Sequence, residues 1–286
     1  MMLLEQMEVA VAPDCQEVIV QAMQVVSDGG VVLYASAPSN CATSTAGVTS
    51  GMEVHHRLVT VLWEYLLAKE IFFGKRFHFS SGIAHPIQII PDPLGRPNLL
   101  LGEHRGPSIS FTTAGDKVWA AIACDDSDIG IDVAGSAEFP EGYPTQRVFH
   151  APELRQALEL ADGNPASAAA LLWSVKEAVV KALGCAFHLV DPRDVHVLPS
   201  AVANGGPIFL VRLSGKALVR FPMANQRPIT VRSLSLVGMW LSIAALNWHH
   251  DRVHFSGPVH ELVLGKSEVT PLNLLVHPEG LEPPTA

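Results

Sequence analysis

The sequence predicts a protein of mixed helices and strands that folds as two compact halves. Its 286 residues are 48% hydrophobic and 16% charged, which is ample apolar material for a buried core. Residues 165–183 carry a helix pattern, whereas short apolar runs bounded by Gly and Pro, such as 208–213, carry a strand pattern. A chain of this length corresponds to one large domain or two small ones, and we expect two.

The earliest predicted elements are a helix and two strands. The N-terminal residues show no regular pattern, and 36–50 is typical of a loop. Residues 58–73 have apolar side chains at helical spacing and are predicted to form a helix that ends near Gly74. Two short apolar runs, 118–124 and 129–133, are predicted to be buried strands on either side of an acidic turn.

The next predicted elements are two helices. One begins at Ala151-Pro152-Glu153 and continues to about residue 160. In the other, Asn164 suits the N-cap, Pro165 suits the first helical position, and Gly184 suits a left-handed stop. These signals predict a helix over 165–183.

Three strands and an irregular tail are expected after that helix. The strands are 208–213, 229–236 and 239–246, separated by Gly and Pro. The last 35 residues hold five prolines and are predicted to be irregular.

Charge is unevenly distributed. The chain has a formal net charge of -9, yet residues 57–117 hold seven basic and five acidic side chains, and 195–250 hold five basic side chains and no acidic one. The acidic balance argues against a nucleic-acid partner, because that affinity comes from excess Lys and Arg. The two basic zones are either solvated faces or contacts for anionic ligands.

Several classes of protein are disfavoured. The longest uncharged apolar stretch, 233–248, is shorter than the roughly 20 residues of a spanning helix. Residues 1–12 contain no Lys or Arg, unlike a signal or transit peptide, so we expect no membrane partner and a cytoplasmic location. The four cysteines are far apart and are expected to be small buried side chains.

One face of helix 165–183 combines unlike charges. Leu171, Leu172 and Val175 lie on the predicted core face, whereas Trp173, Lys176, Glu177 and Lys181 lie on the opposite one. Glu177 and Lys181, one turn apart, form either an ordinary ion pair on a solvated surface or part of a site.

Asp132 interrupts the apolar strand 129–133. A carboxylate buried without a partner costs several kcal/mol, so Asp132 requires local backbone donors at a strand end or a cation. Mg²⁺ is one such cation, because it takes oxygen ligands from carboxylates, phosphates and water. Asp132 and Glu177 are therefore candidate ligands, with Lys181 as a base or a charge stabiliser.

These residues match a known pattern. Gly130-Ile131-Asp132, followed by Trp173-Ser174-Val175-Lys176-Glu177-Ala178-Val179-Val180-Lys181, closely resembles the signature of 4′-phosphopantetheinyl transferases of the large, surfactin-synthetase-activating type. Weaker matches precede each part: Pro93 to Pro97 resembles a Gly-Arg-Pro element, and Arg147 to Glu153 an R-x-F-x-x-x-E segment. The resemblance covers about residues 55–246.

The resemblance implies a fold and an activity. The fold would be α+β, with two similar halves (1–127 and 128–250) related by a pseudo-twofold axis, the active site in the cleft between them, and a tail over 251–286. The activity would be Mg²⁺-dependent transfer of 4′-phosphopantetheine from coenzyme A to a serine of an apo acyl or peptidyl carrier protein, releasing adenosine 3′,5′-bisphosphate. Family members of this type are usually monomers.

The resemblance also implies roles for individual residues. Asp132 and Glu177 would bind Mg²⁺, and Lys181 would contact phosphate or aid proton removal. The residues implied to bind coenzyme A are Arg96, Lys176, Lys69, Arg57, Ser110 and Thr112. The second basic zone, Arg212 to Arg232, is a candidate contact for an acidic carrier protein.

Two positions depart from the family pattern. Ala134 stands where an acidic metal ligand is usual, so water or Glu138 would complete the site. Phe111 stands where the family has a histidine that touches phosphate, and Ser110, Thr112 or Thr113 would substitute for it. These departures keep an alternative open, a relative that binds carrier protein or coenzyme A without turnover.

A histidine group near the C-terminus is a further metal candidate. His249, His250 and His254 lie close together with Asp251 between them. No additional ligand spacing supports a site, so we do not expect one there.

Overall fold

The structure is a computed structural model of the chain. It describes residues 7–9, 18–25, 31–39, 51–69, 86–203, 206–225 and 229–246. The histidine group at 249–254, the tail, Gly74, Cys15 and Cys41 lie outside the described residues.

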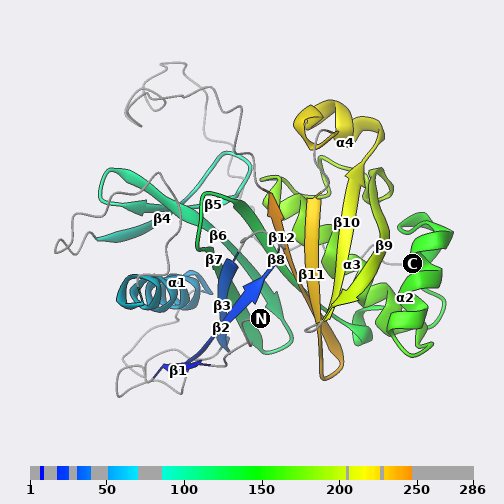
Figure 1. The fold of residues 1–286 in the computed structure, drawn as a ribbon, viewed down its shortest axis with the longest axis horizontal. Coiled ribbons are helices and arrows are strands. Elements are labelled where there is room, and N and C mark those ends of the chain that lie inside the picture. The colour runs from blue at the N-terminus through cyan, green and yellow to red at the C-terminus, as the bar shows by residue number, and fades with distance from the viewer. Residues whose placement is uncertain are drawn as a thin grey trace.

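In the described residues, the first seven strands form one antiparallel sheet, in the order β1-β2-β3-β7-β6-β5-β4 (Figure 1). Its strands are β1 (Met7–Val9), β2 (Val18–Gln24), β3 (Val31–Pro38), β4 (Ile87–Pro91), β5 (Pro97–Leu101), β6 (His104–Ala114) and β7 (Lys117–Ala123). The long hairpin of β6 and β7 is its centre, because β3 pairs with β7 and β5 with β6.

The remaining described strands form a second antiparallel sheet, in the order β8-β12-β11-β10-β9. They are β8 (Asp128–Gly135), β9 (Val195–Ala203), β10 (Gly206–Leu213), β11 (Ile229–Leu236) and β12 (Met239–Leu246). The strand that carries Asp132, β8, is an edge strand of this sheet, paired with β12 alone.

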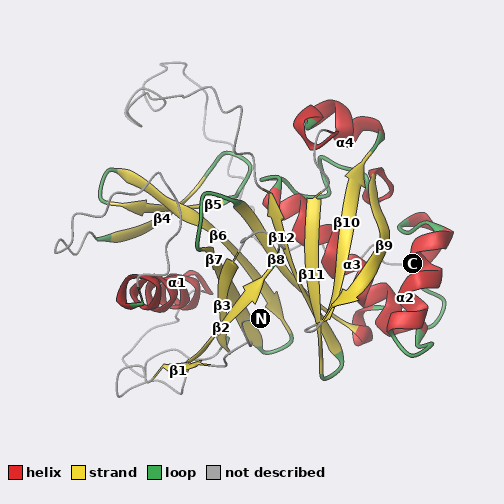
Figure 2. Ribbon diagram, in the orientation of Figure 1, coloured by secondary structure: helices red, strands yellow, loops and turns green. Residues whose placement is uncertain are grey.

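The described helices are α1 (Gly51–Ala68), α2 (Ala151–Leu160), α3 (Pro165–Ala182) and the short α4 (Gly215–Arg220). Three of them, α1, α2 and α3, lie on the outer faces of the two sheets, and the short α4 lies beyond the end of β10 (Figure 2). Four 3-10 turns accompany them: η1 (Ser136–Glu138), η2 (Thr145–Arg147), η3 (Pro192–Asp194) and η4 (Pro222–Asn225).

Three apolar clusters hold these layers together. The first sheet buries one face against α1, through residues such as Leu58, Leu62 and Ile122. Its other face packs on the second sheet, where Trp119 and Ile131 belong to one cluster. The far face of the second sheet packs on α2 and α3. The order of layers is therefore helix, sheet, sheet, helix.

A row of hydroxyl groups on β6 covers the unpaired edge of β8. The Oγ of Ser108 accepts a hydrogen bond from the backbone N–H of Ile129 (3.2 Å), and the Oγ of Ser110 accepts one from that of Ile131 (3.1 Å). Buried backbone donors require partners, and an edge strand has a row of them. These side chains therefore supply the bonds that a neighbouring strand would otherwise make.

Most of the predicted elements are present. The helix predicted over 165–183 is α3, in which Asn164 Oδ1 accepts from the N–H of Ser167 (3.0 Å) and Gly184 has φ +74°. The helix predicted at 151–160 is α2. All five predicted strands are confirmed, with bounds that differ by at most a few residues.

Two predicted elements require correction. The helix placed at 58–73 runs from Gly51 to Ala68, because its buried face begins one turn earlier, at Val54. The predicted loop at 36–50 overlaps the end of β3, which continues to Pro38. β2 and β3 lie in a region where the sequence predicts no element, and β3 is apolar on both faces.

The predicted polar face of α3 is wrong. Trp173, Lys176 and Glu177 are all buried, because α2 and η1 pack on α3 in addition to the sheet. Cys124 and Cys185 are buried, as expected, and both are free thiols. Among the described residues, no helix is long and apolar enough to cross a membrane.

Candidate active site

Asp132, Glu177 and Lys181 meet between β8 and α3. The ammonium Nζ of Lys181 lies 2.7 Å from Oδ1 of Asp132 and 3.4 Å from Oε2 of Glu177. Asp132 and Glu177 are buried, at 3% and 7% exposure, while 24% of the Lys181 side chain is exposed. The surface ion pair considered for Glu177 and Lys181 is thus a buried three-group cluster that opens to solvent at Lys181.

Gly130 allows β8 and α3 to approach this closely. A Cβ at this position would lie 2.0 Å from the carbonyl oxygen of Ala178 and 2.6 Å from the nitrogen of Ala182. A glycine inside a strand often marks such a close backbone approach. Gly130 therefore allows the carboxylate of Asp132 on β8 to lie against Glu177 and Lys181 on α3.

In this cluster, the carboxyl groups of Asp132 and Glu177 share one cation, the Lys181 ammonium. Burial, together with the charge of Asp132, raises the pKa of Glu177 to about 8, although Lys181 opposes the shift. Burial lowers the pKa of Lys181, but the charges of Asp132 and Glu177 outweigh it, so the net shift is upward. Lys181 is therefore held as an ammonium ion, and a second cation would relieve the repulsion between the carboxylates.

Glu138 is the acid expected to replace the ligand that Ala134 lacks. Its Oε1 accepts a hydrogen bond from the N–H of Gly135 (2.5 Å). Burial chiefly, and then the charge of Asp132, raises the pKa of Glu138. Glu138 therefore lies within the electrostatic reach of the cluster, whereas Ala134 contributes only a buried methyl group.

Thr112 and Ser110 are engaged inside the protein. The hydroxyl of Thr112 donates to Oδ1 of Asp132 (2.9 Å), and that of Ser110 accepts from Ile131. Both residues are buried, while Phe111 between them points to the α1 side, where its ring lies 4.6 Å from that of His55. The structure thus uses Ser110 and Thr112 in the junction of the sheets rather than at an open phosphate site.

Arg96 lies beside the first residue of β8 and the C-terminal end of α3, away from the three-group cluster. A turn closed by Asp92, whose Oδ1 accepts from the N–H of Arg96 (2.9 Å), presents this side chain. Its Nη2 donates to Oδ1 of Asp128 (2.8 Å) and to Oγ of Ser108 (3.0 Å). The guanidinium also packs over Gly184, just beyond the C-terminus of α3.

The two other basic residues implied to bind coenzyme A lie on α1. Arg57 is half-buried in the middle of the helix, and Lys69 is exposed at its end, with Nζ 5.9 Å from the ring centre of Tyr65. Because α1 covers the outer face of the first sheet, the structure does not bring either one to Asp132. Their coenzyme A contacts stay predictions.

Lys176 lies in the interior, where no phosphate reaches it. Its side chain is 0% exposed, and its Nζ contacts Oε2 of Glu153 (3.0 Å) and the carbonyl oxygens of Pro192 (2.8 Å) and Val148 (3.3 Å). The phosphate contact implied for Lys176 therefore does not agree with its position. Lys176 instead joins α3 to the start of α2, and Glu153 is the partner that sequence reasoning did not identify.

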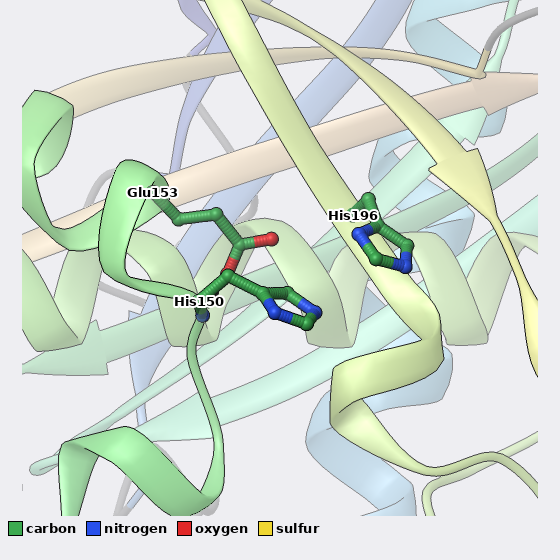
Figure 3. A group of neighbouring side chains, drawn as sticks. All are labelled: His150, Glu153 and His196. Carbon is green, nitrogen blue, oxygen red and sulfur yellow. Dashed lines mark hydrogen bonds between the residues drawn. The ribbon is translucent and has the colours of Figure 1, made fainter.

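A second titratable cluster surrounds this ion pair. Within the described part of the chain, His150, Glu153 and His196 are the one group of three or more His, Cys, Asp or Glu side chains that lie close enough to share a metal ion (Figure 3). Both oxygens of Glu153 are already engaged, because Oε1 accepts from the N–H of Val197 (2.8 Å) and Oε2 from that of His150 (2.8 Å).

The two histidine rings in Figure 3 are stacked rather than convergent, with centres 4.5 Å apart and planes 11° apart. Burial, followed by the charge of His150, lowers the pKa of His196; Lys176 lowers it further, while Glu153 and Asp194 raise it. With the Lys176 ammonium already on Glu153, we assign this cluster to the packing of α2 against β9 and not to metal binding.

The second basic zone is split by burial. Arg212, Lys216 and Arg220 are exposed, whereas Arg232 is buried and its Nη1 donates to the carbonyl oxygen of Gln24 (2.7 Å). Arg232 therefore joins β11 to β2 across the two sheets and is unsuited to contact a carrier protein. Arg227 lies outside the described residues.

Part of the chain is similar to known proteins. A family model, ACPS, described as the 4′-phosphopantetheinyl transferase superfamily, matches residues 128–227, a segment that contains Asp132, Glu177 and Lys181. Among solved structures, the chain is similar to the holo-[acyl-carrier-protein] synthase of Neisseria meningitidis, with 19% identity and a TM-score of 0.33. That match covers 42% of this chain and 97% of the other. No curated protein sequence matches the chain.

Proposed function

We propose that this protein transfers 4′-phosphopantetheine from coenzyme A to a serine hydroxyl of an apo acyl or peptidyl carrier protein, releasing adenosine 3′,5′-bisphosphate. The observation that carries the proposal is the meeting of Asp132, Glu177 and Lys181 inside the segment that the family model matches. Two carboxylates beside an ammonium group are suited to phosphoryl transfer, which requires metal binding and charge stabilisation more than covalent chemistry.

The residues of the cluster fit a divalent cation. Two buried carboxylates, one of which raises the pKa of the other, form a hard, anionic oxygen donor set. Asp132 and Glu177 would hold Mg²⁺, with Glu138 or water as the further ligand. When bound, Mg²⁺ neutralises charge on the pyrophosphate of coenzyme A.

Lys181 acts as a charge stabiliser rather than as the base. The raised pKa of Lys181 keeps its amine protonated at neutral pH, so it has no free lone pair to accept the serine proton. Its partly exposed Nζ can contact a phosphate oxygen. Of the alternatives that the sequence leaves open, we therefore favour phosphate contact.

The position of Arg96 fits a long ligand with separated phosphates. Asp128, the partner of Arg96, and Asp132 are four residues apart along β8, about 13 Å at the rise of a strand. Coenzyme A carries a pyrophosphate and a distinct 3′-phosphate. We propose that the pyrophosphate lies at Asp132 and the 3′-phosphate near Arg96, in a cleft between two similar halves of a cytoplasmic monomer.

Single substitutions test the proposed site. Asp132→Ala and Glu177→Ala are expected to abolish release of adenosine 3′,5′-bisphosphate from coenzyme A in the presence of an apo carrier protein, measured by chromatography. Glu141→Ala, which removes an exposed acid beyond η1, is the matched control and should keep wild-type activity. Circular dichroism checks that each variant is folded. Full activity in either site variant would refute the metal assignment.

A further inference from the structure

The hydroxyl of Thr112 lies on the carboxylate of Asp132, which comes from the other sheet. We infer that Thr112 is a positioning residue: it holds Oδ1 of Asp132 so that Oδ2 is left to bind the cation. The inference rests on the proposed function in that it takes Asp132 as a metal ligand.

Thr112, the last hydroxyl of the row on β6, makes a different kind of contact from the first two. Ser108 and Ser110 accept hydrogen bonds from the backbone of β8, but Thr112 donates one to a side chain. The first two contacts fix the position of the strand. The third fixes the orientation of the one ionisable group that β8 places at the cluster.

Oδ1 of Asp132 is fully engaged. It accepts from Thr112 Oγ1 at 2.9 Å and from Lys181 Nζ at 2.7 Å, which uses both lone pairs of a carboxylate oxygen. The terminal torsion of an aspartate is broad and has little preference of its own, so hydrogen bonds decide how the carboxylate is turned. Donors from two elements, β6 and α3, therefore direct Oδ2 away from themselves.

Burial strengthens the hydrogen bond between Thr112 and Asp132. Thr112 and Asp132 are 8% and 3% exposed, so water does not compete effectively for the bond. Partners of this kind, which touch a metal ligand but not the metal, typically change metal affinity or activity by about 10–100-fold when they are removed.

The same geometry argues against a phosphate contact for Thr112. A threonine hydroxyl has one hydrogen to donate, and here Asp132 receives it. The two roles predict different kinetics. Loss of a phosphate contact raises the KM for coenzyme A, whereas loss of the positioning bond raises the concentration of Mg²⁺ required.

The experiment compares three variants of the full chain. Thr112→Val removes the hydroxyl at nearly constant volume, Thr112→Ser keeps it, and Ser110→Ala removes a neighbouring hydroxyl of the row that touches backbone only. Binding of Mn²⁺ to each protein without substrate is measured by electron paramagnetic resonance. Thermal unfolding is recorded on the same samples, and Thr112→Ala replaces Thr112→Val where that variant is unfolded.

We expect Thr112→Val to weaken Mn²⁺ binding by about 10–100-fold, with Thr112→Ser near wild type. Ser110→Ala should lower the unfolding temperature without changing Mn²⁺ affinity. Unchanged Mn²⁺ affinity in Thr112→Val, or an equal loss in Ser110→Ala, would overturn the inference, as would absence of Mn²⁺ binding by the wild type. Because these measurements use no carrier protein, they separate this inference from failure of the transferase proposal.

Discussion

Replacing Gly130 with alanine tests whether close contact of β8 and α3 builds the site. The conformation of Gly130 is not the obstacle, since it is not among the residues with positive φ. The obstacle is backbone: the new Cβ would lie 2.0 Å from Ala178 O, and side-chain Cβ atoms essentially never approach another atom more closely than 3.0 Å. No rotamer change relieves a contact with main-chain atoms.

The size of the effect follows from that distance. To reach even 3.0 Å, α3 must move away from β8 by about 1 Å, and the carboxyl groups of Asp132 and Glu177 separate with it. Overpacking of this kind costs about 1–3 kcal/mol, which corresponds to a Tm lower by roughly 2–12 °C. A misplacement of about 1 Å at reacting groups reduces rate on the order of 100-fold.

The assay is the rate of phosphopantetheine transfer, with Tm measured on the same protein. Gly135→Ala is the matched control, because it lies in the same strand and its closest new contact would be the flexible carboxylate of Glu138, at 3.2 Å, with Met239 and the Gly238 carbonyl oxygen at ordinary contact distance. We expect Gly135→Ala to stay within a few-fold of wild type. If Gly130→Ala also keeps wild-type Tm and rate, the account of how the site is assembled is wrong.

Three other changes have distinct expected outcomes. Lys176→Met leaves the buried Glu153 without its cation and should destabilise the fold by about 3–5 kcal/mol in chemical unfolding, with partial recovery on adding Glu153→Gln; an unchanged midpoint would contradict the buried pair. Because the pKa of His196 is lowered in the folded state, the unfolded chain binds the proton first. Stability should therefore fall as pH drops from about 6.5 toward the folded pKa, and less so in His196→Gln; equal pH profiles would refute the cause. Arg96→Ala should raise the KM for coenzyme A more than it lowers kcat, and an unchanged KM would remove Arg96 from the phosphate site.

Local signals predicted most elements of the C-terminal part, although β9 and α4 were not predicted. α3 carries its own N-cap in Asn164 and its own stop in Gly184, so its limits depend little on the rest of the fold. β3 was not predicted, because a strand buried on both faces lacks the alternation that identifies a half-exposed one.

Burial of polar side chains was harder to predict than the elements themselves. The helical pattern of α3 places Lys176 opposite the core, and only the packing of α2, which brings Glu153 to it, shows that this side is also interior. Likewise, Thr112 is 20 residues from Asp132 in sequence, and no local signal connects them. Contacts of this kind depend on how the two sheets pack together.

The most direct test of the proposed function is an intact mass measurement on the carrier protein. Several apo carrier proteins are incubated with coenzyme A, Mg²⁺ and this protein, and each mass is recorded before and after. The proposal predicts that at least one carrier gains a single phosphopantetheine group with the wild-type protein and none does with Asp132→Ala. If no carrier gains mass while coenzyme A still binds, the chain is a binding relative and not a transferase.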